Sequence, residues 1–148
     1  MRSLFLTLCV ISAIVTEAQD PYSWKFKAKK IGDKTYEVHF TAKVDQPWHI
    51  YSQETPEGGP VPTKFTLKKN PLLIVTGKVK EVGEPHRRRE EVFGIDVVYY
   101  EDSVDFVQTV TLKANVKVSL GGNIEFMICN DHECMPPATI PFSIPLQP

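Results

Sequence analysis

The clearest structural pattern in the chain is Tyr36-Glu37-Val38-His39-Phe40-Thr41-Ala42-Lys43-Val44, in which apolar and polar side chains alternate. A second run, Trp24-Lys25-Phe26-Lys27-Ala28-Lys29, alternates in the same way. Alternation with a period of two is typical of a β-strand that buries one face. Between the two runs, Gly32-Asp33 forms a short glycine-containing connection of the kind that closes hairpins. The sequence therefore predicts an antiparallel hairpin over this region.

Most of the remaining chain repeats the alternation in short pieces, and helical periodicity is hard to find. Loops are expected at residues 54–62, where three prolines cannot donate to a ladder, and at the polar residues 83–91. Gly121-Gly122-Asn123 indicates a second hairpin turn, between strands at 116–120 and 124–128. Further strands are predicted at 48–52, 63–67, 72–82, 92–100, 104–112 and 139–144. About nine short strands without crossover helices predict an all-β fold, an immunoglobulin-like β-sandwich in one domain.

The N-terminus has the three parts of a secretory signal peptide. Arg2 is basic, residues 4–15 are apolar, and Thr16-Glu17-Ala18 places small residues at the −3 and −1 positions. We expect cleavage of residues 1–18, a mature domain of residues 19–148 and a periplasmic location. A retained anchor, or lipid attachment at Cys9, is the alternative. Leu8 disfavours the lipoprotein reading, because a small residue is wanted before the modified cysteine.

Charge and hydropathy argue against a nucleic-acid partner and against a second membrane-spanning segment. The net charge of −1 argues against nucleic acid, and Arg87-Arg88-Arg89, the one basic run, is followed directly by Glu90-Glu91. A solvated loop explains this run better than a phosphate-binding patch. No second apolar segment of membrane length follows residue 18. We therefore expect no membrane span in the mature chain.

Cys129 and Cys134 are the two cysteines that remain after cleavage, and four residues separate them. Disulfides form and persist in exported proteins, so this spacing predicts a bridged or bridgeable pair. As a structural staple the pair is weak, because closing a loop of about six residues stabilises by only around 2 kcal/mol. A redox pair must open and close without unfolding its host, and Pro136-Pro137 would stiffen the loop exit. From the residues alone, a redox role and a structural role both stand.

A metal site is the third reading of this loop. Cys129, His132 and Cys134 could offer two thiolates and an imidazole to copper or zinc, but a fourth ligand is not evident. We expect neither a metal nor another cofactor. Asp131 and Glu133 lie between the cysteines, and negative charge raises the pKa of a nearby thiol. A pair in this setting suits a specific protein partner better than general thiol scavenging.

Four segments resemble the N-terminal periplasmic domain of the thiol:disulfide interchange protein DsbD, over most of the mature chain. They are Trp48-His49-Ile50-Tyr51-Ser52, Gly58-Gly59-Pro60-Val61-Pro62-Thr63, Glu91-Val92-Phe93-Gly94, and the run from Cys129 to Pro137. The last is the most specific, with two cysteines, an Asn-Asp pair and a proline pair after one residue. The better-known form has five residues between its cysteines, whereas this chain has four.

The resemblance implies an immunoglobulin-like sandwich that takes electrons from a membrane-embedded cysteine pair and exchanges them with thioredoxin-fold proteins of the periplasm. By this likeness Cys134 forms the mixed disulfide and Cys129 resolves it. Glu90, Glu91, Val92 and Phe93 match a cap loop that covers the cysteines, with Phe93 or Val92 as the covering side chain. His49 and Tyr51 match aromatic positions lining the site, with histidine where tyrosine is familiar. Without the resemblance, Tyr51 would more simply be a core residue.

Familiar members continue into a membrane domain and a thioredoxin-like domain, whereas this sequence stops at Pro148. We therefore expect the membrane electron carrier and the thioredoxin-fold partners to be separate chains. Two hypotheses remain: a thiol:disulfide oxidoreductase module, and a non-enzymatic binding module whose disulfide is inert.

Overall fold

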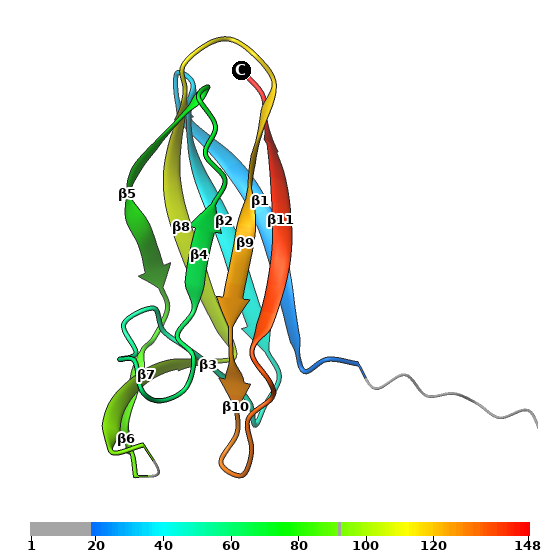
Figure 1. Ribbon diagram of the computed structural model, residues 1–148. Helices are drawn as coiled ribbons and strands as arrows, with labels where there is room; N and C mark the ends of the chain where they lie inside the picture. Colours follow the sequence, from blue (N-terminus) through cyan, green and yellow to red (C-terminus); the bar gives the residue numbers. More distant parts are fainter. Residues whose placement is uncertain (1–18, 92) are drawn as a thin grey trace, which may run out of the picture.

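A computed structural model describes residues 19–91 and 93–148, and those residues form β-strands, turns and loops, without a helix (Figure 1). The predicted signal peptide, residues 1–18, lies outside the described part. Over that part, no helix has the length and apolar character to cross a membrane. The strands are β1 (Tyr22–Gly32), β2 (Thr35–Val44), β3 (His49–Tyr51), β4 (Lys64–Leu67), β5 (Leu73–Val82), β6 (His86–Glu90), β7 (Ile95–Glu101), β8 (Ser103–Leu112), β9 (Val118–Phe126), β10 (Ile128–Cys129) and β11 (Ala138–Leu146).

The strands pair antiparallel into three sheets. Two long sheets, ordered β1-β2-β8-β5 and β11-β9-β4, form the two layers of a sandwich (Figure 1). A short sheet, ordered β10-β3-β7-β6, lies at one end of these layers. The continuous run β9 to β10 and the turn from β7 into β8 join this short sheet to the sandwich. The end sheet is therefore held by elements that also build the core.

The hairpin β1–β2 forms where alternation predicts it, with Gly32 at the end of β1. Every apolar residue of the quoted β2 stretch is buried, from Tyr36 to Val44. Phe40 lies at the centre of an aromatic cluster, with its ring centroid 5.0 Å from that of Phe65 and 4.9 Å from that of Phe142. Burial of these rings, with the aliphatic side chains of the same core, holds the two layers together.

Two expectations about the chain between strands are wrong. Residues 86–90 lie in strand β6, which pairs with β7, although residues 83–91 were expected to be a loop. The charged strand is stable because its backbone pairs with β7 while alternate side chains, those of His86, Arg88 and Glu90, are half-buried.

Gly121-Gly122-Asn123 lies inside the continuous strand β9 and does not form a turn. A Cβ atom on Gly122 would lie 2.4 Å from the Thr66 carbonyl oxygen and 2.6 Å from Cζ of Phe142. Glycine serves here for close approach of neighbouring strands and not for a turn. Over residues 19–91 and 93–148 the structure has eleven strands, against about nine expected.

Candidate functional site

The cysteine loop, residues 129–134, leaves the end of β10 and returns as a tight turn. Sγ of Cys129 is bonded to Sγ of Cys134, and the Cα atoms are 4.0 Å apart. The Asn130 N–H donates to the Glu133 carbonyl at 2.8 Å. The Asn130 side-chain oxygen accepts from the N–H groups of His132 and Glu133, both at 2.8 Å. Asparagine therefore shapes the turn that brings the two thiols together, as Asn side chains do in Asx turns.

The two cysteines differ sharply in exposure. Cys129 is 1% exposed, since it packs with the buried Tyr51 and Val97 of the end sheet. The pairing of β10 with β3 sets Cys129 directly opposite His49. Cys134, the last residue of the cysteine loop, is exposed. A macromolecular partner can therefore reach the sulfur of Cys134 while that of Cys129 stays covered.

Beside the cysteines, one face of the end sheet carries a cluster of aromatic side chains around His49. His49 is 3% exposed, and its ring centroid lies 5.2 Å from Tyr51 and 4.6 Å from Tyr99. Burial, together with the nearby positive charge of Arg88, lowers the pKa of His49 to about 4. Burial also raises the pKa of Tyr51 to about 12. Near neutral pH both side chains are therefore uncharged.

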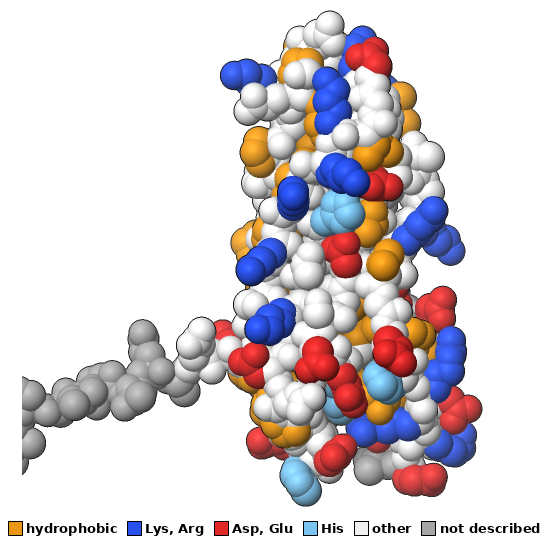
Figure 2. Space-filling view, turned by 180° about the vertical axis from the view of Figure 1, so that it is seen from behind, with side chains coloured by type: hydrophobic (Ala, Val, Ile, Leu, Met, Phe, Trp, Pro, Cys, Tyr) orange, Lys and Arg blue, Asp and Glu red, His pale blue; other side chains and the backbone are white. Residues whose placement is uncertain are grey.

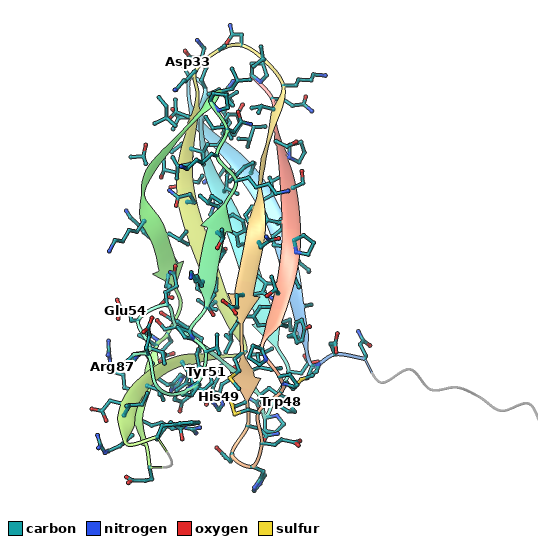
Figure 3. All side chains as sticks on the ribbon, viewed as in Figure 1. Asp33, Trp48, His49, Tyr51, Glu54 and Arg87 are labelled. Carbon is teal, nitrogen blue, oxygen red and sulfur yellow. A yellow bond between two sulfur atoms is a disulfide. The ribbon has the colours of Figure 1, made fainter. Side chains whose placement is uncertain are left out.

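Arg88 of β6 links this cluster to the cysteine loop. Its guanidinium lies 2.6 Å from a Glu90 carboxylate oxygen and 3.1 Å from a carboxylate oxygen of Asp131 in the cysteine loop. The guanidinium carbon also lies 5.1 Å from the ring centroid of Tyr99, a cation–π distance. Hydrogen bonds to Glu90 and Asp131 raise the pKa of Arg88, although burial opposes this, so the charge is permanent. One cation thus ties β6 to the loop that carries the disulfide. Figure 3 shows His49 and Tyr51 at this end of the molecule.

Sequence reasoning missed Arg88, because residues 83–91 were read as a solvated loop. The signal that could have found it is the period of two: His86, Arg88 and Glu90 alternate with Arg87 and Arg89. The first three are half-buried, whereas Arg87 and Arg89 are exposed.

A small cavity of about 280 Å³ lies over the disulfide. Of the residues expected at the site, Tyr51, Glu90, Phe93 and Asp131 line it together with both cysteines. His49 lines an adjoining cavity with Trp48 and Tyr99. Glu91 is exposed and lines neither cavity, and Val92 lies outside the described residues.

The turn between β6 and β7 places Phe93 over this cavity. The N–H groups of Phe93 and Gly94 both donate to the Glu90 carbonyl, at 3.2 and 2.8 Å. Gly94 has φ 66°, a left-handed conformation that glycine adopts at low cost. The tight turn leaves the Phe93 side chain exposed at the rim of the cavity.

The cysteine loop does not assemble a metal-binding group. Among residues 19–91 and 93–148, no three His, Cys, Asp or Glu side chains are placed to hold a metal ion. His132 is exposed at the tip of the turn, and both candidate thiolates are joined in the disulfide.

Comparison with known proteins gives one family and one fold. A family model described as "Thiol:disulfide interchange protein DsbD, N-terminal" matches residues 16–144. Among solved structures, the reduced N-terminal domain of Neisseria meningitidis DsbD matches with a TM-score of 0.56 and 16% identity, over 86% of this chain and 87% of that one. This likeness confirms the immunoglobulin-like sandwich. No curated protein matches the chain. Since the family model spans most of the sequence, the chain belongs to the family of DsbD N-terminal domains.

Proposed function

We propose that this chain is a thiol:disulfide interchange module that relays electrons between thioredoxin-fold proteins and a membrane electron carrier in the periplasm. The observation that carries the proposal is the unequal exposure of the bonded pair: Cys134 is open to a partner and Cys129 is buried behind it. Family membership supports the reaction class and the compartment.

The exchange takes two steps, and atoms and electrons balance. In the reduced protein the Cys134 thiolate attacks one sulfur of a partner disulfide, which releases the other partner sulfur as a thiolate. The Cys129 thiolate then attacks Sγ of Cys134, re-forms the internal disulfide and releases the second partner sulfur. Two electrons pass to the partner, and the two protons lost by the cysteines balance those gained by its thiols. Transfer in the opposite direction runs through the same mixed disulfide.

We assign Phe93 and Glu90 to a cap beside the disulfide. Phe93 lines the cavity over the disulfide from the β6–β7 turn, and Glu90 closes that turn through its backbone carbonyl. In this role, a docking partner would move Phe93 away from the rim of the cavity as it reaches the exposed Cys134. The Arg88 ion pairs with Glu90 and Asp131 would hold this turn against the cysteine loop until then.

Trapping tests the proposal directly. A Cys129→Ser variant cannot resolve a mixed disulfide, so its Cys134 should hold a thioredoxin-fold partner covalently in a periplasmic extract. Cys134→Ser is the matched control, and it should hold much less because Cys129 is buried. Equal trapping by both variants, or no thioredoxin-fold partner in either, would overturn the assignment.

The reduction potential separates this proposal from an inert disulfide in a binding module. We expect a value above about −300 mV, in the range of working oxidoreductases. A lower value would place Cys129–Cys134 among structural disulfides, and the chain would then be a binding module.

A further inference from the structure

The end of the sandwich that lies away from the cysteine pair carries a second surface, which the proposed relay does not use. Three connections meet there: β1–β2, β4–β5 and β8–β9 (Figure 1). Backbone hydrogen bonds join them, from the Leu112 N–H to the Lys34 carbonyl at 2.8 Å and from the Lys113 N–H to the Leu72 carbonyl at 2.9 Å. The three connections therefore form one surface, which we call the distal end.

Each connection of the distal end carries lysines. Lys29, Lys30 and Lys34 lie around the first hairpin, with Asp33 as its one acidic side chain. The β4–β5 connection contributes Lys68-Lys69, which also lie at the rim of an apolar groove of about 530 Å³. The β8–β9 connection contributes Lys113 and Lys117. Positive charge therefore dominates this end.

Each connection also exposes one large apolar side chain among its lysines. Ile31 is 48% exposed, Leu72 is 41% exposed and Val116 is 38% exposed. Apolar side chains that project from a lysine-rich surface are typical of proteins that bind the interface of a membrane. The lysines attract anionic headgroups, and the apolar side chains enter the boundary between headgroups and acyl chains.

The cysteine end carries more acidic than basic side chains, although Arg87, Arg88 and Arg89 of β6 also lie there. Acidic side chains gather around the disulfide, among them Glu90, Glu91, Glu101, Asp131 and Glu133. Figure 2 shows one face, with most Asp and Glu side chains near the cysteine end, where some Lys or Arg side chains also lie, and mainly Lys or Arg side chains over the rest. An anionic surface would therefore attract the distal end and repel the cysteine end.

We propose that the distal end binds an anionic phospholipid membrane. The eleven residues of β1 span roughly 35 Å at the rise of an extended strand, so binding in this orientation keeps the cysteine pair well away from the bilayer. Cys134 would then face the aqueous compartment, where a thioredoxin-fold partner can dock on it. Membrane binding does not depend on exchange activity, and either can fail without the other.

Vesicle sedimentation tests the membrane proposal, with every variant made in the full chain, exported and purified in the same way. The test variant neutralises four lysines of the distal end: Lys68→Gln, Lys69→Gln, Lys113→Gln and Lys117→Gln. The control variant makes the same change in net charge on exposed strand lysines elsewhere: Lys25→Gln, Lys27→Gln, Lys43→Gln and Lys78→Gln. A third variant keeps the charge and removes the apolar side chains: Ile31→Ser, Leu72→Ser and Val116→Ser. Thermal unfolding of each protein establishes that it is folded.

We expect binding to phosphatidylcholine vesicles that contain phosphatidylglycerol, and little binding to phosphatidylcholine alone. The test variant should bind at least about tenfold more weakly than the parent, because each lysine near an anionic surface adds to the attraction. The control should weaken binding much less, and the apolar variant should bind less at high salt. Absence of binding to anionic vesicles, or equal losses in test and control variants, would overturn the proposal. So would selective binding of an acidic protein by the distal end without any binding of vesicles.

The orientation of the bound protein on the vesicle surface can be measured separately. A small water-soluble thiol should reduce the disulfide at about the same rate in the free and the vesicle-bound protein, because Cys134 faces away from the lipid. A large fall in that rate on anionic vesicles would place the cysteine end against the membrane and refute the orientation.

Discussion

The buried His49 makes a quantitative prediction about the stability of the oxidised protein. Its pKa is about 4 in the folded chain and near 6.5 in an unfolded one. The folded state therefore favours the neutral ring, and the unfolded state binds the proton first as pH falls. Stability from this residue is fully present above pH 6.5 and is lost as pH falls from there through about 4.

The size of the effect follows from the two pKa values. Between about pH 7.5 and pH 5, the linkage relation gives a loss of about 2 kcal/mol in the free energy of unfolding. The groups that face His49 are Arg88, Glu90, Asp131 and Tyr51. Arg88 and Tyr51 keep their charge states over that range, so His49 dominates the expected change.

Urea unfolding of the wild type and a His49→Phe variant, at several pH values, measures this loss. Phenylalanine keeps an aromatic ring against Tyr51 and Tyr99 but cannot titrate. The other histidines are present in both proteins, so the difference between the two curves isolates position 49. The difference should change by about 2 kcal/mol over the range, with the wild type losing more as pH falls. Parallel curves, or a wild type that gains stability on acidification, would refute a buried neutral His49.

Three further variants test the contacts that hold the site and the core. Arg88→Met should lower the free energy of unfolding by about 1–3 kcal/mol and should speed reduction of the disulfide by a small thiol. Asp131→Asn, at an exposed carboxylate, should lower the free energy of unfolding by less than about 1 kcal/mol. Equal losses in urea unfolding for the two variants would contradict this. Glu81→Gln should cost about 1–2 kcal/mol, since this carboxylate accepts three hydrogen bonds of 2.7–2.8 Å, and thermal unfolding should show the loss. Phe40→Ala should cost about 3–5 kcal/mol, and the same change at the half-exposed Phe26 clearly less, in urea unfolding; similar losses at both would argue against a core centred on Phe40.

Much of the fold could be predicted from local pattern. The β1–β2 hairpin and strands β3, β4, β5, β8 and β11 lie close to the predicted positions, because one buried face leaves a period of two in the sequence. Local pattern gives the wrong prediction where a glycine or a run of charges has a cause other than a turn or a loop. Gly122 mimics a turn residue but serves close strand packing, and the charges of β6 mimic a loop although its backbone is paired.

In the candidate site too, one part could be predicted from nearby residues in the sequence and another could not. Cys129 and Cys134 are close in sequence, so their spacing in an exported chain was enough to predict a pair. Arg88 lies far in sequence from its partner Asp131, and nothing in the local composition of either segment indicates the contact.

From the sequence by itself follow an all-β chain, its strongest hairpin and a cysteine pair within bridging range. Each of these depends on residues that are near one another along the chain. Only the tertiary structure decides that Cys129 is buried while Cys134 is exposed, since Cys129 packs with Tyr51 and Val97, which are distant in sequence. The tertiary structure also brings three separate lysine-bearing connections to one end of the molecule. Both results depend on backbone pairing between distant segments, which side-chain pattern does not encode.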